Sequence, residues 1–173
     1  MLAAVTYNIG TRAIDAFAPR YLETGRSINE FDIFFLISML KVAGFFSSPL
    51  SGKLSDKVER TKVLYVLIAI EALSLYAITI MSATITIIPC ISFGFASFGL
   101  LAITDAFLAD ISPRDYASTI FGVQFTTSFA VGATIGPILG VMSDIYGYTL
   151  GFTMVSLIIP TSIILLAKVK SEN

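Results

Sequence analysis

Long apolar runs, separated by short polar breaks, are the feature that most limits how this chain of 173 residues can fold. A helix needs about 20 predominantly apolar residues to cross the hydrocarbon core of a bilayer. Only helices and closed barrels satisfy all their backbone polar groups there. The runs predict an all-α, polytopic membrane protein with six transmembrane helices, at Met1–Leu22, Phe31–Gly52, Val63–Ile80, Ile85–Ala109, Pro113–Val141 and Gly147–Ala167.

The composition supports a membrane protein and excludes several other classes. Hydrophobic residues make up 55% of the chain and charged residues 13%, and the mean hydropathy of +0.86 lies above that of soluble domains. A net charge of −1 offers no basic surface for nucleic acid. Because the chain has no histidine and one cysteine, we expect no metal site, no internal disulfide and no cofactor.

The first run carries two charged residues, Arg12 and Asp15, about one turn apart. At the centre of a transmembrane helix each would cost roughly 2.5–3.5 kcal/mol on insertion scales. We therefore expect this run to cross the membrane only where neighbouring helices shield it. The alternative interpretation is a helix that lies in the membrane interface.

Lysine and arginine are unevenly distributed between the runs. One set of connections carries only Arg20 and Arg26, whereas the opposite set carries Lys53, Lys57, Arg60, Lys62, Arg114, Lys168 and Lys170. Lysine and arginine favour the cytoplasmic side of membrane proteins. Both termini are therefore expected in the cytoplasm, and the protein is expected to be integral to the plasma membrane.

One short motif occurs twice, 88 residues apart. Pro49–Asp56 and Pro137–Asp144 both read P-x-x-G-x-x-S-D. Each copy closes the second helix of a three-helix set, and three crossings separate the copies, so they lie on opposite sides of the membrane. This predicts an inverted 3+3 repeat, with units of about 1–82 and 83–169, inside a single unit of 1–173. A chance match between serine- and glycine-rich helix ends is the alternative.

The connection after the second run resembles the cytoplasmic signature of the major facilitator superfamily, G-x-L-(A/S)-D-(R/K)-x-G-R-(R/K). Gly52, Asp56, Arg60 and Lys62 carry the resemblance, and Glu59 stands where the signature has its second glycine.

Two later segments are also similar to that family. Ala109–Arg114 resembles the end of the fourth helix of a family half, and Gly132–Gly140 resembles the middle of the fifth. The fourth run lacks the embedded arginine that is common in the N-terminal half, and the sequence ends just after the sixth run. The chain therefore more closely resembles the C-terminal half.

The resemblance implies a function. Members of the family have two such halves around a central cavity, so we expect one half of a secondary active transporter that moves a small solute by alternating access. The implied partners are a complementary six-helix half (a separate chain or a second copy), the bilayer and the solute. The alternative is a non-transporting membrane protein, truncated or scaffolding, that binds a partner. No arrangement of serine, lysine or paired aspartates matches a catalytic motif, so an enzyme is not expected.

Polar residues of the first run recur with helical spacing. Asn8, Thr11, Arg12 and Asp15 stand at i, i+3, i+4 and i+7, which places them on one face of a helix. The functional interpretation is a cavity wall, in which Arg12 attracts an anionic solute and Asp15 is its partner or a proton carrier. The alternative is a purely structural pair of Arg12 with Asp15.

Four further polar residues lie inside apolar runs. Lys41 and Glu71 are equally far from the connection between the second and third runs, so an antiparallel hairpin places them at equal depth. We expect a structural ion pair, since either charge alone is costly to bury; a role in coupling is the alternative. Asp105 is a candidate titrating group at the inner mouth of the cavity, and Gln124 is a candidate hydrogen-bonding group in it.

The fifth run combines small residues with a proline. Gly132, Gly136 and Gly140, spaced by four, form a groove without side chains that favours close helix packing. Pro137 removes one backbone hydrogen bond, and the functional interpretation is a bend that lets the helix flex during alternating access.

Labelling of single cysteines tests the predicted orientation. With Cys90 replaced, an impermeant thiol reagent applied from outside is expected to label Thr24→Cys and Ser143→Cys and to miss Ser55→Cys and Ser171→Cys. The reversed pattern would contradict the orientation, and labelling of both Ser55→Cys and Ser143→Cys would contradict the inverted repeat.

Overall fold

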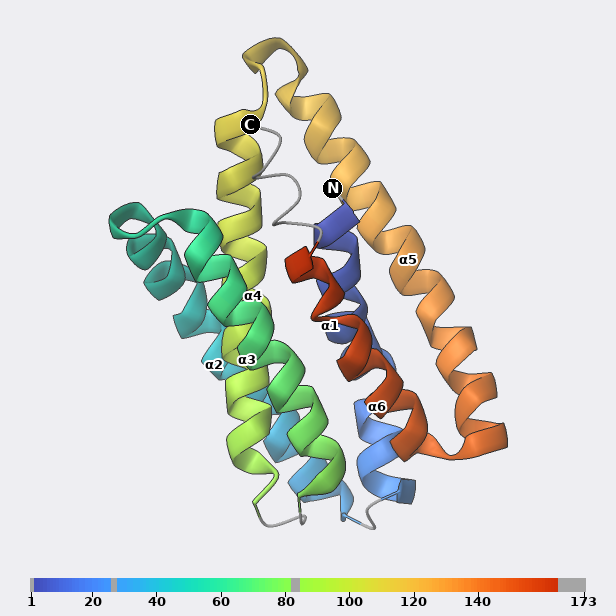
Figure 1. The fold of residues 1–173 in the computed structure, drawn as a ribbon. Helices are drawn as coiled ribbons and strands as arrows, with labels where there is room; N and C mark the ends of the chain where they lie inside the picture. Colours follow the sequence, from blue (N-terminus) through green and yellow to red (C-terminus); the bar gives the residue numbers. More distant parts are fainter. Residues whose placement is uncertain (1, 26–27, 82–84, 165–173) are drawn as a thin grey trace.

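The computed structural model describes residues 2–25, 28–81 and 85–164, and all the regular secondary structure in this part of the chain is helical (Figure 1). A π-helical turn, η1 (Tyr21–Gly25), continues the first helix, and a 3₁₀ turn, η2 (Arg114–Tyr116), precedes the fifth. The main helices are α1 (Leu2–Arg20), α2 (Glu30–Lys57), α3 (Arg60–Ile80), α4 (Ile87–Ile111), α5 (Ala117–Tyr146) and α6 (Tyr148–Ile158). The predicted all-α class is confirmed.

Each of the six apolar runs corresponds to one helix, but the helices differ in their capacity to span a membrane. Within the described residues, four segments are long and apolar enough to do so: Glu30–Lys57, Arg60–Ile80, Ile87–Ile111 and Arg114–Tyr146. The helix α1, which carries Arg12 and Asp15, is not among them, and the apolar helix Thr149–Ile164 is shorter. Six crossings therefore stay a prediction.

The helix α2 begins at a side-chain cap and extends beyond its predicted end. The side chain of Asn29 accepts a hydrogen bond from the backbone N–H of Asp32 at 2.9 Å, which satisfies one free donor at the helix start. With 28 residues, α2 is about 42 Å long, against roughly 30 Å for a hydrocarbon core. We therefore expect its last turns, with Lys53 and Lys57, to reach the headgroup level.

Successive helices run in alternating directions, so their connections gather at two ends of the bundle (Figure 1). The start of α1, the turn from α2 to α3, η2 and the end of α6 lie at one end. We call this the basic end, because its described cationic residues are Lys53, Lys57, Arg60, Lys62 and Arg114. The other end carries η1 and the connections from α3 to α4 and from α5 to α6.

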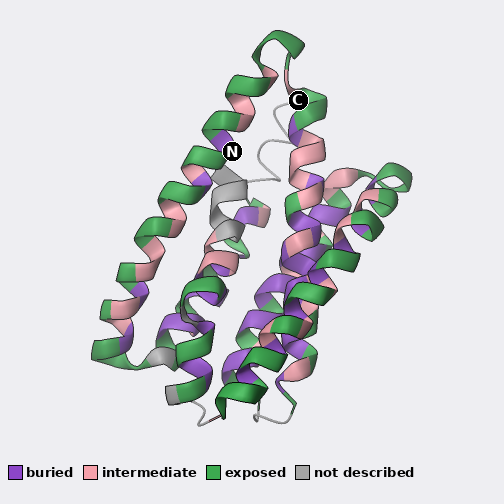
Figure 2. Ribbon diagram, turned by 180° about the vertical axis from the view of Figure 1, so that it is seen from behind, coloured by how far each residue is buried: buried purple, intermediate pink, exposed green. Residues whose placement is uncertain are grey.

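The helices form two groups, one of α2, α3 and α4 and the other of α1, α5 and α6, and the groups meet mainly where α3 contacts α6. α2 and α3 both pack along α4, whereas α1 packs along α5, and α3 meets α6. In Figure 1, α3 and α6 lie nearest the viewer, with α1 and α2 behind them. The fully buried core includes Ile68, Leu75, Leu100, Ile103 and Ile159. Figure 2 shows that burial is concentrated around α4, while most of α5 is exposed.

Small residues allow α2 and α4 to approach closely. A Cβ added at Gly94 would overlap the backbone carbonyl oxygen of Leu40, and one added at Gly44 would overlap the ring of Phe98. Close approach over glycine gains van der Waals contact, which is a main source of helix association in lipid. The α2–α4 contact therefore requires glycine at both positions.

Substitution of Gly94 tests this contact. Gly94→Ala is expected to lower the free energy of unfolding by about 1–3 kcal/mol, since the backbone of Leu40 must move. Gly122→Ala is the matched control, because nothing lies within 4 Å of a Cβ there and alanine favours the helix. Thermal unfolding of the purified protein in detergent measures both changes, and equal stabilities would contradict the packing.

Candidate functional site

The polar stripe of α1 reaches three different helices. Thr11 contacts α3, Arg12 contacts α5 and Asp15 contacts α2. The stripe therefore lies where three helices meet α1, rather than along one open wall. The predicted role of Asn8 is not tested, because its side chain lies outside the described residues.

Asp15 forms an ion pair with Lys41. The carboxylate Oδ1 of Asp15 lies 2.6 Å from Nζ of Lys41, and the two side chains are 37% and 45% exposed. Nζ also lies 5.4 Å from the ring centroid of Phe98 on α4. Lys41 stands near the middle of α2, which is long and apolar enough to span a membrane, and Asp15 stands in the last third of α1.

The predicted pair of Lys41 with Glu71 is wrong. Glu71 is fully buried, and its Oε1 accepts hydrogen bonds from Ser97 Oγ at 2.8 Å and from Thr11 Oγ1 at 3.1 Å. The pairing fails because α2 and α3 each pack along α4 and contact each other little, so equal depth in a hairpin does not bring the two side chains together. Glu71 instead joins α1, α3 and α4.

Arg12 is half-buried against α5 and has no carboxylate partner among the described residues. Its guanidinium carbon lies 4.7 Å from the ring centroid of Phe129, a cation–π contact. Its Nε is buried without a hydrogen-bond partner in the described part of the chain. A Cβ at Gly132 would lie 3.0 Å from the side-chain carbons of Arg12, so this glycine makes room for it.

These contacts leave one positive charge, that of Arg12, between α1 and α5 without a carboxylate partner in the described residues. The alternative pairing of Arg12 with Asp15 is not found, because Asp15 is bound to Lys41. We call Arg12, Asp15 and Lys41 the charged triad; its formal charges sum to +1. An arrangement with one neutralised ion pair and one guanidinium free of carboxylates is suited to an anion.

The remaining candidates lie around this triad. Asp105 is half-buried near the basic end of α4 and takes part in none of the contacts above. Gln124 is buried on α5, and its Oε1 has no hydrogen-bond partner in the described segments. A Cβ at Gly136 would meet nothing within 4 Å, Gly140 is half-buried, and α5 runs without interruption through Pro137. No described helix therefore fills the predicted groove at Gly136.

The signature residues connect three helices at the basic end. Nη1 of Arg60 lies 3.2 Å from the carboxylate of Asp110 on α4, and Nη2 lies 3.8 Å from that of Asp56 on α2. Nζ of Lys62 lies 3.6 Å from Glu59. Nothing lies within 4 Å of a Cβ placed at Gly52. Arg60 thus holds the end of α4 against the turn between α2 and α3.

Sequence reasoning missed three residues of these clusters: Ser97, Phe98 and Phe129. Ser97 and Phe98 lie in a stretch of α4 that contains Gly94 and other small residues, a pattern that signals close packing but not its partner. Phe129 is one of 14 phenylalanines, and nothing in its spacing distinguishes it. Across the described residues, no group of three or more aspartate, glutamate, cysteine or histidine side chains is placed to hold a metal ion.

Comparison with known proteins gives one match. A family model described as the Major Facilitator Superfamily matches residues 1–137, which is more than half of the chain. No curated protein and no solved structure matches the chain.

A double-mutant cycle tests the revised pairing. Asp15→Ala and Lys41→Ala are expected to be non-additive, with a coupling of roughly 0.5–3 kcal/mol in the free energy of unfolding, because each single change leaves one charge unpaired. The control cycle of Lys41→Ala with Glu71→Ala is expected to be additive within about 0.5 kcal/mol. Coupling in the control cycle alone would restore the pair of Lys41 with Glu71.

Proposed function

The chain belongs to the major facilitator superfamily, a family of membrane transporters, and from this we propose that it forms one six-helix half of a secondary transporter. This half moves a small anionic solute by alternating access. The observation that carries the proposal is the charged triad inside the apolar helices α1 and α2, with an exposed ion pair of Asp15 and Lys41 and a half-buried Arg12. Charged side chains inside membrane-spanning helices usually mark a solute or ion pathway.

The exposure of Asp15 and Lys41 supports the presence of a partner that covers them. A charge in contact with lipid at the bilayer centre costs roughly 2.5–3.5 kcal/mol. Lys41 and Asp15 are 45% and 37% exposed, so the described helices leave both in contact with whatever lies outside. A complementary six-helix half, either a separate chain or a second copy, would cover this face and enclose a polar cavity.

The packing pattern supports the inverted repeat. Exchange of the first three helices with the last three maps α1 onto α4 and α2 onto α5, so the contact of α1 with α5 has the contact of α2 with α4 as its counterpart. The contact of α3 with α6 maps onto itself. We therefore keep two units of about 1–82 and 83–169, six crossings and a cytoplasmic basic end as parts of the proposal.

The solute is proposed to be an anion because Arg12 is the unneutralised member of the triad. Lys41 already compensates Asp15, so a carboxylate or phosphate would complete the charge balance of the face. Arginine presents a planar fork of donors that binds such groups in a bidentate manner.

Gln124 and Asp105 are further candidates for the site. Gln124 is proposed as a hydrogen-bonding group of the cavity, and Asp105 as a titrating group at its inner mouth. The absence of arginine from α4 supports the proposal that this chain is the C-terminal half.

Substitution of Arg12 tests the function. In liposomes that contain this chain with its complementary half, Arg12→Lys is expected to lower the uptake of small carboxylate or phosphate anions roughly tenfold, the equivalent of one lost charge-assisted hydrogen bond. Arg114→Lys is the matched control, since this arginine is exposed at the basic end and lies outside the triad. Radiolabelled uptake at equal protein content measures both.

Two results would contradict the proposal. Unchanged uptake of every transported anion by Arg12→Lys would remove Arg12 from the binding site. Absence of uptake of any solute by the assembled wild-type protein would instead favour a non-transporting membrane protein that binds a partner.

A further inference from the structure

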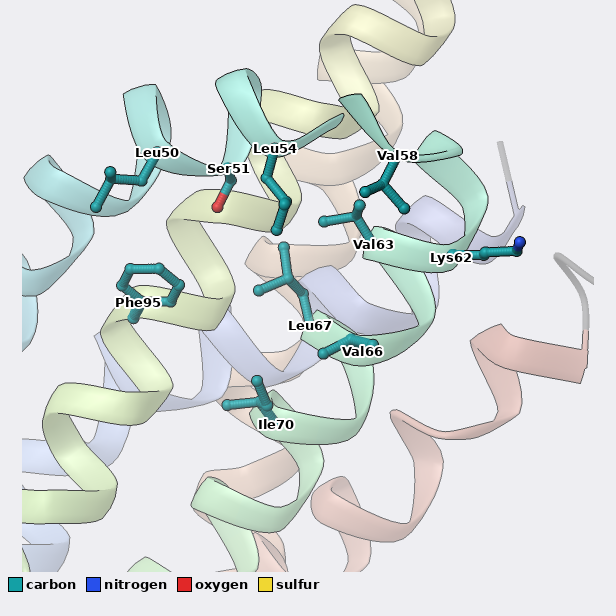
Figure 3. Close-up of a pocket in the computed structure, with 10 residues that line it drawn as sticks. All are labelled: Leu50, Ser51, Leu54, Val58, Lys62, Val63, Val66, Leu67, Ile70 and Phe95. Carbon is teal, nitrogen blue, oxygen red and sulfur yellow. The ribbon is translucent and has the colours of Figure 1, made fainter. Parts of the chain in front are cut away.

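A groove of about 520 Å³ lies between α2 and α3 and begins at the basic end (Figure 3). It forms because both helices pack on α4 and little on each other, and Phe95 of α4 also lines it. Ser51 Oγ is the one side-chain oxygen in its lining, and it is within hydrogen-bond distance of Ser47 Oγ, at 3.3 Å. The volume falls within the roughly 300–1,000 Å³ of small-molecule sites.

The groove runs along the helices from the basic end into the depth of the membrane. One wall extends from Val58, the residue after α2, back to Leu50, and the other extends along α3 from Lys62 to Ile70. Each wall covers eight residue steps, or about 12 Å of helix. In Figure 3, Lys62 and Val58 stand at one end of the groove and Leu50 at the other. The groove therefore has a polar mouth and an apolar interior.

The open side of the groove is apolar and uncovered by the described helices. Leu50, Leu54 and Val66 are 55%, 50% and 58% exposed. α2 and α3 are both long and apolar enough to span a membrane. These side chains therefore lie where acyl chains are the surrounding solvent.

Two lysines stand at the mouth. Lys62 lines the groove, its side chain is 69% exposed, and its only ion pair in the described region is with Glu59 at 3.6 Å. Lys57 follows Leu50 by seven residues and Leu54 by three, so it lies on the same stripe of α2 as these two wall residues. It is exposed and has no ion pair in the part of the chain that the structure describes.

We propose that this groove binds an anionic phospholipid, with one acyl chain along Leu50–Val58 and the phosphate between Lys57 and Lys62. A lipid satisfies both halves of the site, because its chain fills the apolar interior while its headgroup meets the lysines at headgroup level. Basic pockets between transmembrane helices bind anionic headgroups in this way. A second helix would cover the apolar walls but would leave the charge of Lys57 without a counterion. The inference does not depend on the transport function.

Tryptophan fluorescence provides a direct test, since the chain has no tryptophan. Val66→Trp places a reporter in the groove wall, and Val123→Trp on α5 is its matched control. Each position is six residues from the start of its helix, about 9 Å from the basic end, and the valines are 58% and 47% exposed. Each variant is placed in phosphatidylcholine bilayers with a small fraction of brominated phosphatidylglycerol or of brominated phosphatidylcholine.

The anionic lipid is expected to quench Val66→Trp more strongly than the zwitterionic lipid with the same brominated chains, and to show no such preference at Val123→Trp. Each lysine is expected to contribute roughly fivefold to the preference, so Lys57→Gln combined with Lys62→Gln removes it. Arg114→Gln, which removes a cation at the same end away from the groove, is expected to keep it. The substituted lysines are exposed, so the fold is expected to persist.

Three results would overturn the proposal. Equal quenching of Val66→Trp by the two brominated lipids would show ordinary boundary lipid. Absence of quenching by either lipid would show that a protein segment covers the groove. Loss of the preference on addition of glycerol phosphate would assign the lysines to a free phosphate rather than to a lipid.

Discussion

The cost of charge inside a bilayer is the constraint on which the rest of this structure depends. Four of the described segments are long and apolar enough to span a membrane, and two of them carry Lys41 and Glu71. Arg12 and Asp15 lie on α1, which packs against these helices. The fold treats these charges in three ways: an ion pair between α1 and α2, a cation–π contact with α5, and complete burial with two hydroxyl donors. The order of helices around α1 decides which charge receives which treatment.

The charged residues of this protein differ in how far they are buried, and this difference separates Glu71 from the charged triad. Glu71 is enclosed by α1, α3 and α4, and its Oε1 accepts hydrogen bonds from the hydroxyl groups of Thr11 and Ser97 where these helices meet. In the charged triad, Asp15 and Lys41 are exposed, whereas the unneutralised member, Arg12, is half-buried against α5. The carboxyl group of Glu71 is thus enclosed within the bundle, whereas the triad is partly exposed and carries a net positive charge.

The cations of the basic end also differ in whether carboxylates of the bundle bind them. Arg60 is engaged by Asp110 and Asp56, which fixes the turn between α2 and α3 against α4. Lys62 instead lines the end of the groove between α2 and α3, and its side chain is 69% exposed. Arg60 and Lys62, two residues apart in the sequence, thus have different surroundings, since Arg60 is bound by carboxylates of two other helices and Lys62 is largely exposed.

The sequence by itself determined the elements, and the tertiary structure decided their partners. Apolar runs about as long as a bilayer crossing predicted all six helices, and the motif around Arg60 predicted the family, because hydrophobic length and local motifs are properties of continuous segments. Equal depth suggested a pair of Lys41 with Glu71, but depth fixes only one coordinate. The rotation of each helix about its axis and the choice of neighbours brought Asp15 to Lys41 and Phe129 to Arg12, and these follow from packing around α1 and α4, which no single segment encodes.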